Sequence, residues 1–503
     1  MRQREGDMTV SGGARSARRG WPIAVAAVAL ALGGLAAITV AGRPGPGPVL
    51  ATVALGSSVG LPAIGVDEVV GRAYVVANSR SSAGPQAATV RVLNTATGAL
   101  VGTAALPGQT GGEMVMVVDT RRGRVYVASS GGTSCSSTGS GSQTCTATSA
   151  AFVALDARTG QSLHTLPVDA GRGLALDGRT GLLYALPSGG TVGGGAPTLL
   201  RAIDGRSGRI VRAIVLPGDA QGGGFGALAL DGSVLVAVRV SFGRPGALRA
   251  SADVVDLARG RLVGHIALPG AGFVVPYRPS LVDAARGRAY ISLGAYGAVA
   301  GQVEVIDTRR ATLLRATTTG RGLGSIVQDT RMGRVYTTAL GAFRTITTRT
   351  RGGGAATTQA PTGVGGLRVL DARSGALVRS VPIGLGATGV AVDERRGRVY
   401  ALSIGPADAR GGLTRPGTLS VVNERSGQVV RTLAVGAVPL TLALDRRHDR
   451  LLVGCAGAFG GTPDDPWGWV PGQVRHLLPF LPRPPAPIST PQGSVLVLDT
   501  TRL

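Results

Sequence analysis

The chain has 503 residues and a formal net charge of +24, and its basic residues other than histidine are all arginine. Aromatic residues make up only 4% of the sequence, so we expect a core of valine, leucine, alanine and isoleucine. Two interpretations of the charge stay open, namely solvated arginines in turns and a surface that binds polyanions. The arginines do not alternate with aromatic residues, which disfavours single-stranded nucleic acid as a partner.

The first 48 residues predict export. Residues 1–20 form a polar tail with five arginines, and residues 21–41, WPIAVAAVALALGGLAAITVA, carry no charge. A helix of that length, at about 1.5 Å per residue, crosses a hydrocarbon core of about 30 Å. Arginines before the span predict a single-pass signal anchor with a cytoplasmic tail, a Pro/Gly linker at residues 42–48 and an extracytoplasmic remainder. A cleavable signal peptide is the alternative, because Thr39-Val40-Ala41 resembles a cleavage site.

From residue 49 to residue 503 the sequence repeats one unit, which is clearest between Gly389 and Gly436. Four short apolar runs stand in that copy, and the polar segments Asp393–Gly397 and Asn423–Gly427 each hold a glycine, as hairpin loops do. The runs are rich in β-branched residues and too short for typical helices, so the unit is a four-stranded antiparallel meander. It recurs eight times, which predicts the blades of a β-propeller.

The two ends of this region predict how the ring closes. The eighth copy stops at Leu503 after three strands, and Val49–Gly56 (VLATVALG) has the pattern of the missing fourth strand. We therefore expect an all-β, eight-bladed β-propeller whose last blade is completed by the N-terminal strand, with one transmembrane helix before it. A seven-bladed ring is the alternative, because the fourth copy is degenerate around Asp231–Ser233.

Three insertions interrupt the repeats. Residues 129–149 hold Cys135 and Cys145 in a loop rich in serine and glycine, and an exported chain permits the disulfide that we predict between them. Two thiols without a nearby histidine do not suit a zinc site. Residues 344–366 are expected as a loop, and Cys455 is expected as a buried free thiol in an apolar strand.

The insertion at residues 458–492 gathers apolar side chains in a proline-broken loop. These side chains are Trp467, Trp469, Leu477, Leu478, Phe480 and Leu481. One interpretation is a plug that packs over one face of the ring. The other is a contact surface for the membrane or a partner, since exposed apolar patches on loops mark interaction sites.

No motif assigns a catalytic, cofactor-binding or metal-binding residue, and the cofactor stays unknown. His164 and His265 are expected on outer strands, His448 in a hairpin turn and His476 in the last insertion, none at ligand spacing. One aspartate recurs at the first turn of every copy, and we expect it to cap that turn by accepting backbone N–H bonds rather than to build a carboxylate ring. These aspartates are Asp67, Asp119, Asp177, Asp231, Asp283, Asp329, Asp393 and Asp445.

Two kinds of half-repeat carry a resemblance. Val118-Asp119…Tyr126-Val127 is one example of the first half, and Val421–Gly427 is one of the second. They resemble the YVTN-type β-propeller repeats of bacterial and archaeal surface proteins over residues 49–503, although no copy reads Y-V-T-N and copies four and eight lack the tyrosine. The resemblance implies an exported or surface propeller and is nearly silent on activity.

We therefore expect a membrane-anchored extracytoplasmic module that binds a small ligand or a protein through loops at one face of the ring. Two alternatives stay open. One is a hydrolase or lactonase-like enzyme with a site at the channel mouth, and the other is polyanion binding through arginine-rich turns.

Overall fold

The computed structural model describes residues 47–57, 63–77, 80–81, 84–85, 88–106, 114–129, 132–137, 143–148, 151–166, 173–186, 198–217, 223–242, 248–269, 280–294, 300–322, 324–349, 355–408, 412–457 and 492–503. These residues belong to the compact unit Val40–Leu503. They form eight four-stranded antiparallel sheets and three two-stranded ones. No helix within these segments is long and apolar enough to cross a membrane, and the predicted span at residues 21–41 lies outside them.

Each four-stranded sheet is one blade. Blades 1 to 4 consist of β2 (Ala63–Asp67), β3 (Arg72–Ala77), β6 (Thr89–Asn94) and β7 (Leu100–Ala105); β8 (Met114–Asp119), β9 (Arg124–Ser129), β12 (Ala151–Asp156) and β13 (Ser162–Leu166); β14 (Gly173–Asp177), β15 (Leu182–Leu186), β16 (Thr198–Asp204) and β17 (Ile210–Leu216); and β18 (Gly223–Asp231), β19 (Val234–Phe242), β20 (Leu248–Asp256) and β21 (Arg261–Leu268).

Blades 5 to 8 follow the same order from the centre outward. They consist of β22 (Ser280–Asp283), β23 (Arg288–Leu293), β24 (Ala300–Asp307) and β25 (Thr312–Arg321); β26 (Ile326–Asp329), β27 (Arg334–Ala339), β30 (Val364–Asp371) and β31 (Leu377–Leu385); β32 (Ala387–Asp393), β33 (Arg398–Ser403), β34 (Gly417–Asn423) and β35 (Val429–Gly436); and β36 (Pro439–Asp445), β37 (Arg450–Cys455), β38 (Gln492–Asp499) and β1 (Val49–Ser57). A short 3-10 turn, η1 (Thr500–Arg502), ends the chain.

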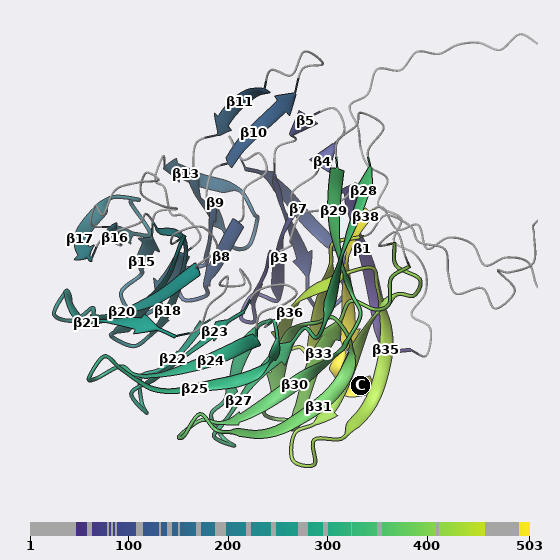
Figure 1. The fold of residues 1–503 in the computed structure, drawn as a ribbon. Helices are drawn as coiled ribbons and strands as arrows, with labels where there is room; N and C mark the ends of the chain where they lie inside the picture. Colours follow the sequence, from purple (N-terminus) through teal and green to yellow (C-terminus); the bar gives the residue numbers. More distant parts are fainter. Residues whose placement is uncertain are drawn as a thin grey trace, which may run out of the picture. The chain divides into compact units, whose positions relative to one another are not determined.

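The eight blades close into a ring. The innermost strand of each blade contacts the innermost strands on both sides, and β2 of blade 1 contacts β36 of blade 8 (Figure 1). The outer strand of blade 8 is the N-terminal strand β1, which pairs antiparallel with β38 and sets Val49 opposite Leu498. The backbone N–H of Asp499 also donates to the carbonyl of Pro48 at 2.8 Å. The predicted closure by the N-terminal strand is therefore confirmed.

Blade 4 explains why the fourth copy looks degenerate in the sequence. Its first hairpin turns through only two residues, Gly232 and Ser233, so that Asp231 pairs with Val234. Gly232 has a φ of 59°, which glycine adopts without strain and which tight hairpins require. The copy has a shortened turn but all four strands, so the seven-bladed alternative is wrong.

The aliphatic core lies between neighbouring blades. Successive residues of a strand point to opposite faces of its sheet. In β3, Tyr74 and Val76 pack against blade 2, whereas Ala73 and Val75 pack against Leu452 of blade 8. Both faces of each blade are buried in this way, which explains why the second strands are unbroken apolar runs rather than alternating ones.

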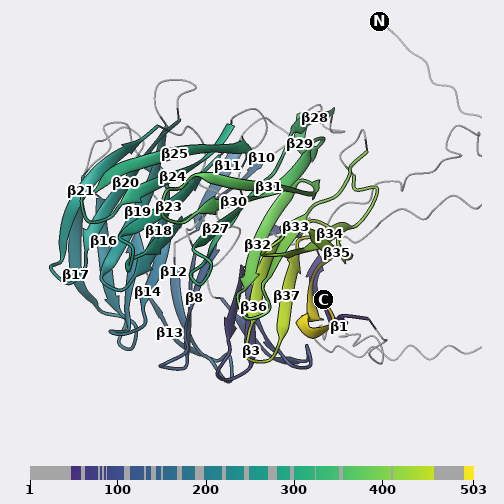
Figure 2. The ribbon, with the colours of Figure 1, turned by 90° about the horizontal axis from the view of Figure 1, so that it is seen from below.

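The connections define two faces of the ring. Because successive strands are antiparallel, the turns between strands 1 and 2 and between strands 3 and 4 share one side, which we call the turn face. The connections between strands 2 and 3 and from blade to blade lie on the other side, which we call the insertion face. Three hairpins interrupt the strand 2–3 connections of blades 1, 2 and 6, namely β4 (Arg80–Ser81) with β5 (Gly84–Pro85), β10 (Gly132–Ser137) with β11 (Gln143–Thr148), and β28 (Phe343–Arg349) with β29 (Ala355–Pro361) (Figure 1). Figure 2 shows the last two of these hairpins from another side. The insertion expected as a loop at residues 344–366 is therefore largely a β-hairpin.

Candidate functional site

The insertion face gathers the long connections of the ring and is the candidate binding surface. The hairpin of β28 and β29 is held at its base by backbone bonds between Ala342 and the segment Thr362–Gly363. Arg344 of this hairpin donates to the carbonyl of Asp408 at 2.7 Å, in the strand 2–3 connection of blade 7. That connection is itself ordered by a bond from Thr414 N to Pro406 O. Two neighbouring blades thus present a braced polar surface on this side.

Two predicted site residues, Cys135 and Cys145, belong to this face. Cys135 lies directly opposite Cys145 in the β10–β11 hairpin. Opposed residues of an antiparallel pair have Cα atoms about 4.5–5.5 Å apart, a separation that suits a disulfide. The backbone register therefore agrees with the predicted bond, which stays a prediction. Trp467, Trp469, Leu477, Leu478, Phe480, Leu481 and His476 lie outside the described residues.

The turn aspartates cap their own turns. Asp67 is fully buried, and its Oδ1 accepts backbone N–H bonds from Val69 at 2.9 Å and Val70 at 3.2 Å. Equivalent bonds occur at Asp119, Asp177, Asp283, Asp329, Asp393 and Asp445. Asp231 differs, because its two-residue turn leaves its carboxylate to accept from Ala284 N of blade 5 at 2.7 Å. The predicted capping role is therefore confirmed for seven of the eight aspartates and is wrong for Asp231.

The repeated tyrosine has a structural role that the sequence analysis missed. Tyr126 of blade 2 donates to the carbonyl of Gly205 in blade 3 at 3.0 Å. Tyr74 and Tyr290 donate in the same way to Ala157 and Ala372 of the next blade. Burial raises the pKa of Tyr126 to about 12, so the hydroxyl keeps its proton. The tyrosine that recurs in six of the eight repeats is the available signal, but the acceptor of Tyr126 lies about eighty residues further along the chain.

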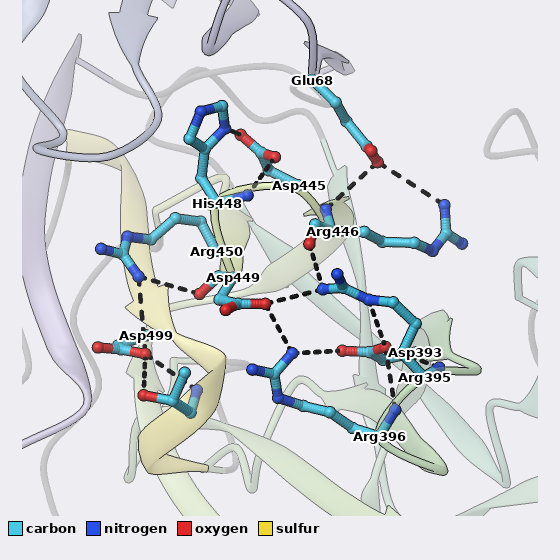
Figure 3. A network of polar contacts seen from close by, with 11 residues as sticks. Glu68, Asp393, Arg395, Arg396, Asp445, Arg446, His448, Asp449, Arg450 and Asp499 are labelled. Carbon is cyan, nitrogen blue, oxygen red and sulfur yellow. Dashed lines mark hydrogen bonds and ion pairs between the residues drawn. The ribbon is translucent and has the colours of Figure 1, made fainter.

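Arginines on the turn face also link neighbouring blades. Arg122 of blade 2 donates to the carbonyls of Gly178 and Arg179 in blade 3, both at 3.1 Å. One network of this kind joins blades 7, 8 and 1 at the place where the ring closes (Figure 3). Many turn arginines are therefore structural, which is a third interpretation beside solvated charge and polyanion binding.

Asp449 is the centre of that network. Its Oδ1 lies 2.8 Å from Nη2 of Arg395 and 2.7 Å from Nη1 of Arg396, and the hydrogen bond from Arg396 lowers the pKa of Asp449. Glu68 of blade 1 accepts from the backbone N–H of Arg446 at 3.3 Å. His448 lies in a turn, as predicted, with Nδ1 2.8 Å from the Asp445 carboxylate. The acidic and basic side chains of this network pair with one another, so we assign it a structural role and not a ligand-binding one.

A second polar cluster lies between blades 6 and 7. Glu424 lies in the strand 3–4 turn of blade 7, at the position where the same turn of blades 2, 3 and 6 has a small residue. Its side chain is only 2% exposed. Its Oε1 accepts from the hydroxyl of Tyr336 at 2.9 Å, and its Oε2 lies 3.2 Å from Arg331. Burial, together with a hydrogen bond to the Asp329 carboxyl, raises the pKa of Glu424 to about 7. Two acidic groups therefore share this buried position.

A buried ion pair lies within blade 4, on the side that faces blade 3. Asp253 is fully buried, and its carboxylate lies 2.7 Å from Nη2 of Arg239 and 2.7 Å from Nδ1 of His265. Arg239 also donates to the carbonyl of Pro217 in blade 3 at 2.5 Å. Burial raises the pKa of Asp253 despite these partners. His265 lies on the outer strand β21 and His164 on β13, as predicted.

Within the segments that the structure describes, no three histidine, cysteine, aspartate or glutamate side chains gather as metal ligands do. Cys455 is buried, as expected, and its thiol donates to the carbonyl of Val435 at 3.1 Å. Burial raises the pKa of Cys455 to about 12, which leaves the thiol protonated and unreactive.

Comparisons with known proteins define the class of this protein by fold alone. No family model matches the chain, and no curated protein matches its sequence. Among solved structures, a europium-containing methanol dehydrogenase superposes with a TM-score of 0.53 at 12% identity, over 90% of this chain and 93% of that chain. Sqt1 of Saccharomyces cerevisiae superposes with a TM-score of 0.52 at 10% identity, over 90% of this chain and 99% of that chain. BamB from Moraxella catarrhalis reaches a TM-score of 0.38 at 16% identity, over 69% of this chain and 82% of that chain.

The chain is thus an all-β, eight-bladed β-propeller. Identities this low carry no activity from those proteins to this one.

Proposed function

We propose that the chain is an exported propeller of the YVTN type, anchored in the cell membrane by residues 21–41, and that its insertion face binds a protein partner. The observation that carries the proposal is the distribution of connections. The long strand 2–3 connections share the insertion face, where β28 and β29 are braced against blade 7. Binding residues concentrate on loops that a rigid scaffold positions.

Two predicted features have roles in this proposal. The apolar residues of the insertion at residues 458–492, from Trp467 to Leu481, supply the anchor side chains of the contact, since buried aromatic residues carry much of the binding energy of interfaces. A disulfide between Cys135 and Cys145 stiffens the β10–β11 hairpin on the same face. Both features belong to strand 2–3 connections, so one partner protein could contact both of them.

The test is recovery of a partner by the full chain from membranes of the source cells. Deleting residues 459–491 should abolish recovery of a discrete partner while leaving thermal unfolding of the ring unchanged. The matched control neutralises Arg158 and Arg206 on the turn face, which should leave recovery intact. A partner that survives the deletion refutes the contact role of the insertion, and an unfolded deletion variant favours the plug.

The enzyme alternative has its own measurement. Elemental analysis of the purified chain would detect a bound divalent metal, and one equivalent would favour a hydrolase site over a binding module.

A further inference from the structure

The turn face holds several exposed arginines whose acidic partners are buried. In its turns arginines outnumber acidic residues. Arg179 is 79% exposed and Arg310 is 81% exposed, whereas their partners Asp177 and Asp307 are each 10% exposed. The aspartates are drawn inward because their carboxylates accept backbone N–H bonds of the turn. At these turns the guanidinium groups are therefore more exposed than the carboxylates.

The outer edge of the same face is apolar. In blades 1 to 7 the outer strand begins directly after a turn of the turn face, and exposed aliphatic side chains recur within the first three residues of these strands. They are Val101, Val211, Val263, Leu314, Val378 and Val430. Surfaces that combine basic groups with exposed aliphatic side chains suit the headgroup region of an anionic bilayer.

The chain joins the ring on this face. Val49 pairs with Leu498 at the turn-face end of β38, and Arg502 donates to the carbonyl of Gly47 at 3.3 Å. A Pro/Gly linker at residues 42–48, as the sequence predicts, would span at most about 20 Å at roughly 3 Å per residue. A membrane anchor at residues 21–41, as proposed above, would therefore bring the turn face rather than the insertion face toward the lipid.

We propose that the turn face docks on an anionic phospholipid surface through its outward arginines. The occupant is a bilayer and not a nucleic acid, because the basic groups are spread around a ring of turns and aliphatic side chains border them. The exposed arginines support docking without any assumption about an anchor. The orientation of the ring on the membrane rests on the anchor proposed above. Docking in this orientation leaves the insertion face free for the protein partner.

The test measures binding of residues 43–503 to vesicles. All eight blades and the closing strand lie in residues 49–503, so this chain keeps the ring contacts described above. We expect it to bind phosphatidylglycerol vesicles, to ignore phosphatidylcholine vesicles and to bind less tightly as salt rises. No binding to the anionic vesicles at low salt would overturn the proposal.

Four arginines give the matched variants. Arg158, Arg206, Arg310 and Arg373 are exposed in the strand 3–4 turns of four blades, and their guanidinium groups make no bond to a neighbouring blade within the described segments. Each arginine near an anionic surface strengthens binding roughly fivefold, so replacing all four by glutamine should weaken binding by more than a hundredfold. The control replaces Arg249, Arg321, Arg344 and Arg415, four exposed arginines at the insertion-face end of their blades, and should change binding by less than about threefold.

Equal losses in the two variants would contradict docking by the turn face. Binding to heparin or duplex DNA as tight as that to vesicles would overturn the choice of a bilayer and indicate a general polyanion surface. Thermal unfolding checks that both variants fold. If one does not, the unmodified chain is titrated with vesicles of rising phosphatidylglycerol fraction, and binding that does not rise with that fraction would refute the proposal. None of these outcomes depends on the protein partner at the insertion face.

Discussion

Glu424 makes the stability of the ring depend on pH in an unusual direction. Its pKa rises from an ordinary 4.5 to about 7 in the folded chain, chiefly because the side chain is buried. The folded state therefore binds a proton between pH 4.5 and pH 7 that the unfolded state releases. A raised pKa contributes stability that is complete at low pH and is lost as the pH rises through 7. The shift of about 2.5 units corresponds to about 3 kcal/mol.

The measurement is the free energy of unfolding by denaturant at pH 5 and pH 8. Glu424→Gln keeps an acceptor for Tyr336 but cannot ionise, so it should match the parent chain at pH 5 and exceed it by up to about 3 kcal/mol at pH 8. The control Glu394→Gln removes a partly exposed carboxylate from the same pair of blades and should lack this effect. If the parent chain and Glu424→Gln change equally between the two pH values, the reasoning is refuted.

Three other predictions use stability or chemistry as the readout. Tyr126→Phe should lower the free energy of unfolding by about 1 kcal/mol, because it removes the hydrogen bond to blade 3. Tyr400→Phe should leave the free energy of unfolding unchanged, since that hydroxyl is buried without a partner among the described residues. Arg239→Leu should lower the free energy of unfolding by about 3–5 kcal/mol, because it leaves the Asp253 carboxylate buried without its main partner. Adding Asp253→Leu should recover part of that loss. Chemical denaturation measures both variants. Thiol titration of the denatured, unreduced chain should find one free thiol, Cys455, and three free thiols would refute the bond between Cys135 and Cys145.

The architecture could be predicted because a propeller blade is built from local signals. Short apolar runs, glycine turns and the strict order of half-repeats identify four strands per copy without any long-range contact. The closing role of Val49–Ser57 was also predictable, since one copy lacks a strand that this segment resembles. Only Gly232 and Ser233 obscured the blade count, because a two-residue turn replaces the longer one.

The polar contacts between blades could not be predicted in the same way. Tyr126 and Gly205 are 79 positions apart, and Tyr336 and Glu424 are 88 apart, so no local pattern indicates which blade faces supply the partners. Glu424 looks like an ordinary turn residue in sequence and becomes special only because Asp329 and Tyr336 of the previous blade face it. The ion pair of Arg239 and Asp253 lies within one blade, on the paired strands β19 and β20, but it too has no local signal because each residue is a single charge between two apolar neighbours in its strand.

The central claim is that the two faces of the ring have different partners. Its most direct test places a photocrosslinking residue in the full chain, in membranes of the source cells, either at Phe343 on the insertion face or at Thr97 on the turn face. The account predicts a discrete protein product from position 343 and lipid products from position 97. A protein product from position 97 with none from position 343 would contradict it.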